Sequence, residues 1–397
     1  MSTGAVSAGV VVLGAGQAGF QLAVSLREGG YADPITLVGE EAEPPYQRPP
    51  LSKVFLKGGD GPESLSFRPP SFFERHGIGL RLNTRALRID REAARVLTEP
   101  GGWLGYDRLV LATGARNRPL ALPGAALESV VSLRGAEDGL ALRAALARSR
   151  RVVIIGGGFL GLEVASSARA MGAEVTVIEA GERLMGRAVS PAVSRHFLEY
   201  HRSRGVTVEL GQTISAILGE GRAEGVTTTE GRDIPADLVV MAVGVVPNTE
   251  IAEAAGLAVD RGIIVDHALR TSDPRIHAIG DCARFPSAHG GGLTRLESVQ
   301  NAVDQARCAA ADILGKPQPY EAVPWFWSDQ GERLQIAGLT ADAEETVTRG
   351  GPEAFSVYCF RNGVLIGAES VNRPADHVKA RRMLATAERP QRAAFAS

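Results

Sequence analysis

The sequence predicts an α/β protein built on doubly wound parallel sheets and completed by a C-terminal α+β segment. Two glycine clusters each follow a short run of aliphatic residues and open a helical pattern. Each cluster is then followed by a second apolar strand with a glutamate at or just past its end. The whole pattern occurs twice, about 140 residues apart, and an internal duplication is stronger evidence than either glycine cluster alone.

The first copy starts with the apolar run 10–13, which is typical of a buried parallel strand. A helix is expected over 20–26 and a further strand over 35–38. Backbone amides at a glycine-rich helix N-terminus bind a pyrophosphate, and an acidic residue after the second strand accepts hydrogen bonds from ribose hydroxyls. The residues of this copy that predict a dinucleotide site are Gly14, Gly16, Gly19 and Glu40.

The second copy repeats this order, with a strand over 152–155, a helix starting near Leu162 and a strand over 174–178. Each copy also has a similar later strand, within 107–114 and 237–244. Two complete sets predict two bound dinucleotides. The residues of the second set are Gly156, Gly158, Gly161 and Glu179.

Glu179 bears on the choice of nicotinamide cofactor. A carboxylate stabilises a ribose 2′-hydroxyl by about 1.5–3 kcal/mol. A 2′-phosphate in the same place meets like charge, which costs about 4 kcal/mol at 4 Å with an effective dielectric of 20. We therefore expect NADH to be preferred over NADPH. Arg183 lies nearby, and a basic residue there would weaken this preference.

Beyond the second copy, the segment 276–281 ends at Asp281, and a long helical pattern runs from about 297 to 314. Asp281 is a candidate to accept a bond from a flavin ribityl hydroxyl, with a turn aspartate that caps its own backbone as the alternative. A break at 315–319 precedes a final segment with strand-like runs at 355–359 and 364–366.

Composition excludes several other classes of protein. The 397 residues carry 43 Lys plus Arg and 45 Asp plus Glu, and only 5% are aromatic, which disfavours nucleic-acid binding. Three cysteines, spaced far apart, give no disulfide framework, no metal-binding cluster is visible, and Met1 to Ala5 lack the basic start of a secretory signal. We expect a cytoplasmic protein with no metal site and no membrane span.

With these motifs in place, the chain resembles the FAD-dependent NADH:ferredoxin reductases of cytochrome P450 and Rieske oxygenase systems, within the pyridine nucleotide-disulfide oxidoreductases. The Pro-Pro-Leu-Ser-Lys and Trp-Ser-Asp-Gln stretches are specific to this group, whereas the glycine motifs are shared by many flavoenzymes. The stretches that carry the resemblance cover nearly the whole chain in family order: 14–19, 48–53, 111–114, 156–163, 280–283 and 325–330.

The resemblance implies a glutathione-reductase-like fold of two Rossmann-like domains and a C-terminal domain. It places an FAD domain at 1–115 and 248–323, an NADH domain at 116–247 and the C-terminal domain at 324–397. The implied FAD residues are Gly14, Gly16, Ala18, Gly19, Glu40, Arg48, Lys53, Ala86, Ala112, Thr113, Gly114, Arg134, Asp281, Val299 and Trp327. The implied NADH residues are Gly156, Gly158, Leu160, Gly161, Glu163, Glu179, Val243 and Gly244.

The same resemblance implies the chemistry. Hydride passes from nicotinamide C4 to flavin N5, and single electrons then pass to a [2Fe–2S] ferredoxin. Lys53 is expected beside the flavin and paired with Glu163, and Trp327 near both cofactors, so these three are the catalytic candidates. Arg68 and Arg307 are candidate docking residues for an acidic ferredoxin. The protein is expected to be a monomer or a dimer.

No cysteine precedes Cys282, which disfavours the disulfide reductases of this fold, and Cys282 itself is expected to be a packed, inert thiol. Other functions remain open. One is a different enzyme of the same fold, either a rubredoxin reductase or an H2O2-forming NADH oxidase. The other is a redox-dependent binding protein similar to apoptosis-inducing factor.

Overall fold

The computed structural model describes residues 7–395. Met1 to Ala5, on which the expectation about a secretory signal depends, lie outside these residues. Contacts divide the chain into two compact units, each made of three segments. The first unit consists of residues 1–47, 61–116 and 246–322, and the second of 48–60, 117–245 and 323–397. The three-domain division predicted above stays a prediction.

The first unit is built on a five-stranded parallel sheet with the strand order β19-β7-β1-β2-β3. Its strands are β1 (Val10–Leu13), β2 (Ile35–Val38), β3 (Ile78–Arg81), β7 (Arg108–Leu111) and β19 (Ile276–Ala278). Strands β1 and β2 and residues 109–111 of β7 are almost completely buried aliphatic runs, as expected for a parallel sheet covered on both faces, whereas the edge strand β3 buries only Ile78. The predicted strands at 10–13 and 35–38 are confirmed.

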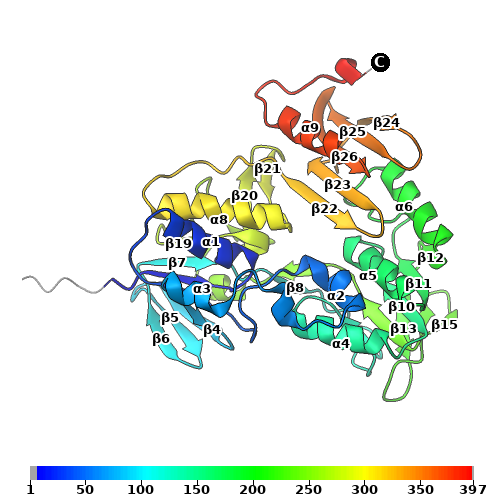
Figure 1. The fold of residues 1–397 in the computed structure, drawn as a ribbon, viewed down its shortest axis with the longest axis horizontal. Coiled ribbons are helices and arrows are strands. Elements are labelled where there is room, and N and C mark those ends of the chain that lie inside the picture. The colour runs from blue at the N-terminus through cyan, green and yellow to red at the C-terminus, as the bar shows by residue number, and fades with distance from the viewer. Residues whose placement is uncertain (1–6, 396–397) are drawn as a thin grey trace, which may run out of the picture. The chain divides into compact units, whose positions relative to one another are not determined.

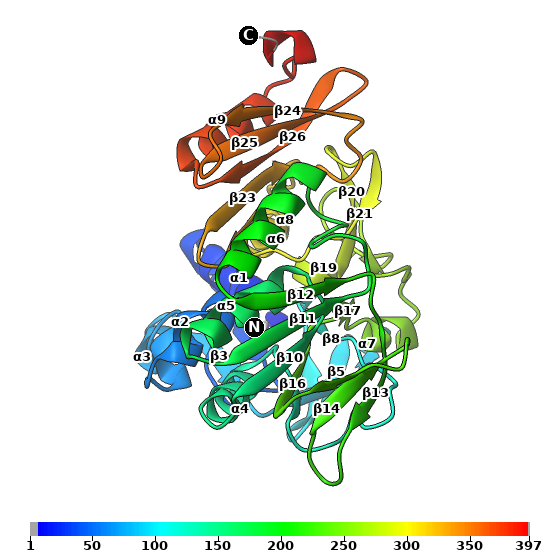
Figure 2. The same ribbon diagram turned by 90° about the vertical axis from the view of Figure 1, so that its right-hand side faces the viewer.

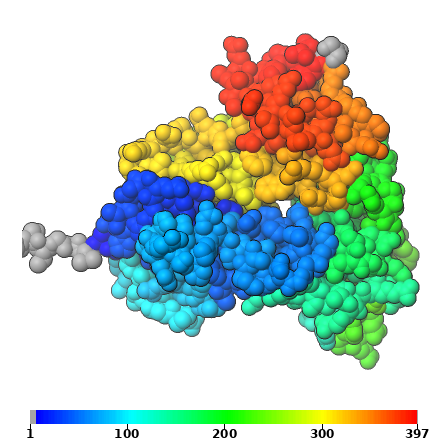
Figure 3. Space-filling view, in the orientation of Figure 1, coloured from blue at the N-terminus to red at the C-terminus, as the bar shows by residue number. Residues whose placement is uncertain are grey.

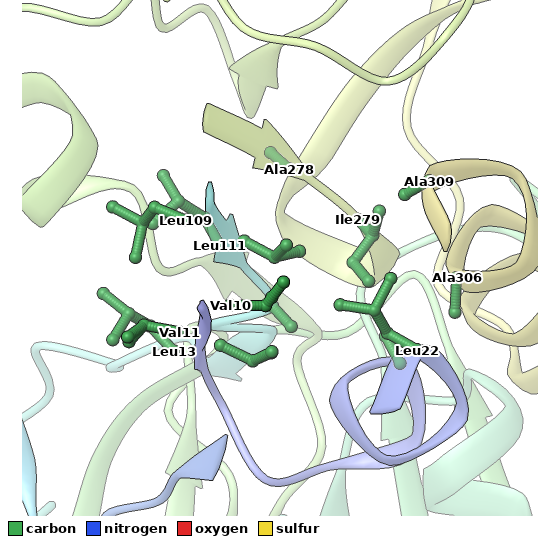
Figure 4. Packing of buried hydrophobic residues seen from close by; sticks show 14 of the residues in the cluster. Val10, Val11, Leu13, Leu22, Leu109, Leu111, Ala278, Ile279, Ala306 and Ala309 are labelled. Atoms are coloured by element: carbon green, nitrogen blue, oxygen red, sulfur yellow. The ribbon is translucent and has the colours of Figure 1, made fainter. Parts of the chain in front are cut away.

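Two helices of the first unit, α1 (Gln17–Glu28) and α8 (Val299–Ile313), pack against each other beside this sheet (Figure 1). Leu22 of α1 and Ala306 and Ala309 of α8 turn toward the strands (Figure 4). The small alanines allow the helix backbone to come close to the sheet. The helical pattern predicted over 297–314 is confirmed by α8.

Shorter elements complete the first unit. Two small three-stranded sheets have the orders β4-β5-β6 and β18-β20-β21. The remaining elements are β4 (Arg85–Asp90), β5 (Arg95–Glu99), β6 (Gly102–Gly105), β18 (Ile263–Ile264), β20 (Ala283–Ser287), β21 (Gly292–Thr294), α3 (Pro70–Arg75), α7 (Glu250–Ala254), η2 (Pro62–Leu65) and η3 (Gly280–Cys282).

The second unit contains a parallel sheet with the corresponding order, β9-β16-β10-β11-β12, of which Figure 2 labels β16, β10, β11 and β12. Its strands are β9 (Val130–Ser132), β10 (Arg151–Ile155), β11 (Glu174–Glu179), β12 (Val206–Leu210) and β16 (Leu238–Met241). The matching strand orders confirm the internal duplication. The two chain crossings carry the short strands β8 (Ala115–Asn117) and β17 (Val245–Pro247).

Helices and a small antiparallel sheet surround this second parallel sheet. The helical segments are η1 (Pro49–Ser52), α2 (Val54–Lys57), α4 (Ala136–Leu146), α5 (Phe159–Ala170) and α6 (Pro191–Ser203). The antiparallel strands are β13 (Ile214–Leu218), β14 (Gly225–Thr228) and β15 (Asp233–Pro235).

The C-terminal part of the second unit is a five-stranded antiparallel sheet with the order β22-β23-β26-β25-β24. Glu369 on this sheet is buried, and its carboxylate accepts hydrogen bonds from both the backbone N–H and the hydroxyl of Ser190, the N-cap of α6. Figure 3 shows the orange C-terminal residues directly against the green residues of α6. The elements are β22 (Trp325–Asp329), β23 (Arg333–Gly338), β24 (Glu345–Gly350), β25 (Phe355–Arg361), β26 (Val364–Val371), α9 (Pro374–Leu384) and η4 (Arg392–Phe395).

These elements confirm the predicted fold class, two parallel α/β sheets and a C-terminal α+β segment. Between residues 7 and 395, no helix is both long and apolar enough to cross a membrane. The same residues contain no group of three or more His, Cys, Asp or Glu side chains placed to hold a metal ion.

Candidate functional site: two glycine loops and a buried lysine–glutamate pair

In the first glycine loop, two of the three glycines are required by the protein's own backbone. Gly14 has φ +120°, and a Cβ there would lie 2.0 Å from the carbonyl oxygen of Ala112. A Cβ on Gly19 would lie 2.0 Å from the carbonyl oxygen of Gly14. Both positions exclude any larger residue, whatever the loop binds.

The middle glycine of this loop is different, because a Cβ on Gly16 would meet nothing within 4 Å. Gly16 is the N-cap of the 12-residue helix α1, and no side chain caps that helix. The helix therefore starts with open N–H groups and an open glycine surface, which fits a phosphate group brought close to the backbone. The geometry of this loop therefore fits the pyrophosphate of a dinucleotide.

The second loop has the same geometry. Gly156 has φ +111°, with the carbonyl oxygen of Ala242 2.4 Å from where its Cβ would be, and a Cβ on Gly161 would lie 2.1 Å from the Gly156 oxygen. Gly158 is open within 4 Å and is the N-cap of the 12-residue helix α5, again without a capping side chain. The second loop fits a second dinucleotide for the same reasons.

The two acidic residues differ. Glu179, the last residue of β11, accepts a hydrogen bond from the Gly157 N–H at 2.7 Å and another from the Gly181 N–H at 2.7 Å. Glu40 lies two residues past β2, its side chain is 70% exposed, and its carboxylate is 3.6 Å from Arg85. Only Glu179 is therefore held against its own glycine loop.

The guanidinium of Arg183, the residue near Glu179 that could allow NADPH to bind, is already engaged by backbone carbonyls. Its two terminal nitrogens donate to the backbone carbonyls of Val189 and Gly186, both at 2.6 Å.

Further predicted FAD residues lie in the first unit around the first loop. Ala112, Thr113 and Gly114 directly follow β7, where Ala112 contacts Gly14 as described above. The hydroxyl of Thr113 donates to the Asn248 carbonyl at 2.7 Å. Asp281 follows Gly280, whose Cβ position lies 3.2 Å from the Ala18 side chain at the start of α1. Val299 begins α8, and Ala86 lies on β4.

Four other predicted FAD residues lie in the second unit. Arg48 donates to the backbone carbonyl of Arg134 at 2.7 Å. Lys53 lies between η1 and α2, and Trp327 is on β22 with its ring 5.6 Å from that of Trp325. Of the predicted NADH residues, Leu160 and Glu163 lie on α5, and Val243 and Gly244 directly follow β16.

The second unit brings Lys53 and Glu163 together. The Lys53 ammonium donates to Glu163 Oε2 at 2.6 Å, and the two side chains are 21% and 8% exposed. The ion pair that the resemblance implied is present. The hydroxyl of Ser52 donates to the same oxygen at 2.6 Å, and the hydroxyl of Ser328 donates to Oε1 at 2.7 Å.

Sequence reasoning missed these two serines and the groups behind them. Gln330 donates from Nε2 to Ser328 Oγ at 3.2 Å and to the Met185 sulfur at 3.4 Å, and its Oε1 is 3.0 Å from His201 Nε2. Burial lowers the pKa of His201. Ser52 belongs to the Pro-Pro-Leu-Ser-Lys stretch, and Ser328 and Gln330 to Trp-Ser-Asp-Gln. The polar residues of these two stretches were therefore the sequence signal that could have indicated the partners of Glu163.

The other singled-out side chains are placed as follows. Cys282 is buried, and burial raises the pKa of its thiol, which confirms its interpretation as a packed thiol. Arg68 and Arg307 are both exposed. Arg68 lies over the Phe72 ring at 5.7 Å, and Arg307 pairs with Asp304 at 3.4 Å.

Comparisons with known proteins agree with this geometry. A family model described as pyridine nucleotide-disulphide oxidoreductase matches residues 8–306, and one described as reductase C-terminal matches residues 325–397. Rhodocoxin reductase of Rhodococcus erythropolis is 51% identical over 381 residues, which cover 95% of this chain and 89% of that protein.

Two further relatives extend the comparison. The ferredoxin–NAD(+) reductase component of the anthranilate 1,2-dioxygenase system of Burkholderia cepacia is 40% identical over 384 residues, covering 96% of this chain and 95% of that protein. The crystal structure of the ferredoxin reductase for the CYP199A2 system from Rhodopseudomonas palustris matches with a TM-score of 0.96 and 48% identity. That match covers 98% of both chains.

Proposed function

Because the chain belongs to the pyridine nucleotide-disulphide oxidoreductase family, we propose that it is an NADH-dependent flavoprotein reductase that delivers electrons to a [2Fe–2S] ferredoxin of an oxygenase system. The observation that carries the proposal is the presence of two glycine loops of equal geometry, of which only the second is followed by a buried, lysine-paired glutamate. The matches to relatives named as ferredoxin reductases support the same function, because they cover nearly the full length of both proteins.

FAD and NAD(H) are the cofactors of this family. The first loop, with Gly14, Gly16 and Gly19, would hold the FAD pyrophosphate, and the second, with Gly156, Gly158 and Gly161, that of NADH. When bound, FAD accepts a hydride from NADH and releases electrons one at a time, as an iron–sulfur acceptor requires.

Lys53 supplies a positive charge that stabilises negative charge on a reduced cofactor. Glu163 holds that ammonium in place through the 2.6 Å contact, so the charge does not depend on a freely rotating side chain. Trp327, on the strand next to Ser328, is proposed as an aromatic wall of the cofactor site.

Glu179 selects NADH. Its carboxylate is already fixed by two backbone N–H groups, and each carboxylate oxygen retains acceptor capacity for a ribose hydroxyl. Arg183 donates to its own loop, which supports a strict preference because its terminal guanidinium nitrogens already have backbone partners.

Arg68 and Arg307 are proposed to contact the ferredoxin, since exposed cations attract an acidic electron carrier. The Asp304 carboxylate beside Arg307 reduces the local positive charge, so Arg68 is expected to contribute more. The cytoplasm is proposed as the compartment because the described cysteines are all free thiols.

The proposal is tested by measuring NADH-dependent reduction of cytochrome c with and without an added [2Fe–2S] ferredoxin. We expect the rate to depend on the ferredoxin and to fall as salt is raised. Stimulation by a rubredoxin alone would assign the chain to rubredoxin reductases. Rapid NADH consumption by oxygen without any carrier would assign it to NADH oxidases. A long-lived charge-transfer band after slow reduction would favour the redox-dependent binding protein.

A further inference from the structure

The Trp-Ser-Asp-Gln stretch contains two buried polar residues, Ser328 and Gln330, that the proposed function does not use. Both are completely buried, although they lie at the start of the C-terminal sheet and about 165 residues from Glu163 in sequence. A buried serine and a buried glutamine require hydrogen-bond partners, and here the partners connect them to the proposed site.

The direction of each hydrogen bond follows from the chemistry of the groups. Gln330 Nε2 can only donate, so Ser328 Oγ accepts from it at 3.2 Å. The single hydroxyl proton of Ser328 is then free to donate to Glu163 Oε1, at 2.7 Å. Gln330 Oε1 can only accept, which makes His201 Nε2 the donor across the 3.0 Å contact.

A second, shorter series of donors reaches the other oxygen of the same carboxylate. Lys53 donates to Ser52 Oγ at 3.3 Å, and Ser52 donates to Glu163 Oε2 at 2.6 Å. Glu163 therefore accepts at both oxygens, from groups on the two other segments of the second unit. With these three donors, about one of the four acceptor sites of a carboxylate remains.

The strand geometry links this network to Trp327. Successive side chains of a strand point to opposite faces. Phe326 and Ser328 contact α5, through the Phe159 ring at 4.5 Å and through Glu163, whereas Trp325 and Trp327 pack together on the other face. The Ser328–Glu163 bond thus links the carboxylate on α5 directly to the strand that carries Trp327.

We propose that Ser328, supported by Gln330, is a positioning residue for the proposed reaction and acts through Glu163. It holds the carboxylate so that Lys53 stays paired, and it fixes the strand that carries Trp327. This inference rests on the proposed function, because the reaction that Ser328 supports is the transfer of electrons from NADH.

The test compares Ser328→Ala, Glu163→Gln and the double variant by anaerobic stopped-flow reduction of the FAD-loaded protein at saturating NADH. We expect Ser328→Ala to lower the rate about tenfold, since it removes a hydrogen bond to a charged group. In the Glu163→Gln background, the same change should lower the rate less than about twofold.

The matched control is Ser356→Ala. Ser356 is also completely buried, lies on the same C-terminal sheet, and bonds to Ser370 and Asp376 rather than to Glu163. It should lower the melting temperature without changing the reduction rate, and its effect should add to that of Glu163→Gln. Thermal unfolding provides a measurement that is independent of activity. The double variant should lower the melting temperature by less than the sum of the shifts in Ser328→Ala and Glu163→Gln.

The proposal would be overturned if Ser328→Ala reduced its FAD at the wild-type rate. It would also be overturned if Ser328→Ala lowered the rate equally in the wild-type and Glu163→Gln proteins and the shifts in melting temperature were additive. If the wild-type protein is not reduced by NADH at all, the proposed function fails, and the role of Ser328 in the reaction fails with it. The unfolding measurements would still decide separately whether Ser328 and Glu163 are coupled.

Discussion

The two glycine loops have the same backbone requirements and different chemical surroundings. In each loop the first and third glycines are excluded from carrying a Cβ by a backbone carbonyl, while the middle glycine is open. The helix after the second loop then carries Glu163 where the helix after the first carries Gln21. Glu163 is buried and paired with Lys53, whereas Gln21 only donates to Ser25 one turn along its own helix, at 3.0 Å.

This difference separates binding from reactivity. Backbone N–H groups at a helix N-terminus suit any pyrophosphate, so the loop geometry by itself favours no reaction. A buried carboxylate–ammonium pair is costly to place in a protein interior unless further hydrogen bonds support it, and both oxygens of Glu163 accept such bonds from serine hydroxyls. We therefore propose that the helix after the second loop, α5, contributes to the chemistry, while α1 contributes to holding a cofactor.

The largest expected effect comes from substituting the first glycine of each loop, and the middle glycine of the same loop is its comparison. Gly14→Ala and Gly156→Ala should each cost about 3 kcal/mol of unfolding free energy, because a Cβ at positive φ meets a carbonyl oxygen. Gly16→Ala and Gly158→Ala should cost at most about 1 kcal/mol. Instead, Gly16→Ala should reduce FAD content, and Gly158→Ala should raise the KM for NADH.

Denaturant unfolding and flavin absorbance measure these effects. Equal destabilisation by the outer and middle substitutions would contradict the assignment of the middle glycines to the cofactors.

The next largest effect concerns the difference between α5, which carries Glu163, and α1, which carries Gln21 in the same place. Lys53→Met should slow FAD reduction by NADH about 100-fold, since it removes the charge paired with Glu163. The stopped-flow rate is the measurement, and Gln21→Ala is the control in the first unit, expected to leave the rate unchanged. A wild-type rate in Lys53→Met would refute the role of the lysine.

A smaller effect distinguishes the two acidic residues. Glu179→Gln should lower the ratio of kcat/KM for NADH over NADPH at least about tenfold, because the like charge facing a 2′-phosphate is removed. Glu40→Gln should weaken FAD binding and leave that ratio as it is in the wild type. A ratio that moves equally in both variants would show that the fixed position of Glu179 is irrelevant.

The smallest predicted effect is a difference in acid sensitivity. In the second unit, burial lowers the pKa of His201, and burial with the nearby Arg381 and Arg333 lowers that of His377 to about 4. Both histidines take up protons more readily in the unfolded chain. Their contribution to stability is complete above about pH 6.5 and is lost as the pH falls toward about 4.

In the first unit, burial by itself raises the pKa of Asp312, but hydrogen bonds from His277 and Arg270 hold it at about 2. Its contribution is complete above about pH 3.8 and is lost only below that. His377→Leu should therefore flatten the fall in melting temperature between pH 6.5 and 4 by about 3 °C, and Asp312→Asn should not. The reverse pattern in melting curves would contradict this assignment.

Much of the fold could be predicted because its signals are local. The aliphatic strands β1, β2, β10 and β11, the glycine turns and the helix α8 follow from residues within about 15 positions of each other. The Lys53–Glu163 pair was expected only from the resemblance to a family, which the comparisons confirm. Spacing alone gives no reason to join two residues 110 positions apart.

The fifth strand of each parallel sheet shows where local signals end. Strand β9 comes before the glycine loop of the second unit in sequence. Strand β19 comes long after the glycine loop of the first unit, beyond residues 117–245 of the second unit, yet the two strands occupy the same edge of their respective sheets. Both strands are only three residues long. Their positions depend on pairing with β16 and β7, which the sequence pattern does not reveal.

The two glycine loops, their strands and the acidic residues can be recognised without a structure, because steric exclusion at a glycine and burial of an aliphatic run act over a few residues. Folding brings Ser52 and Ser328 onto Glu163 and places Gln330 and His201 behind Ser328, and the sequence pattern gives no sign of either arrangement. Hydrogen bonds between buried polar groups form wherever folding brings donor and acceptor together, and no local pattern records that meeting.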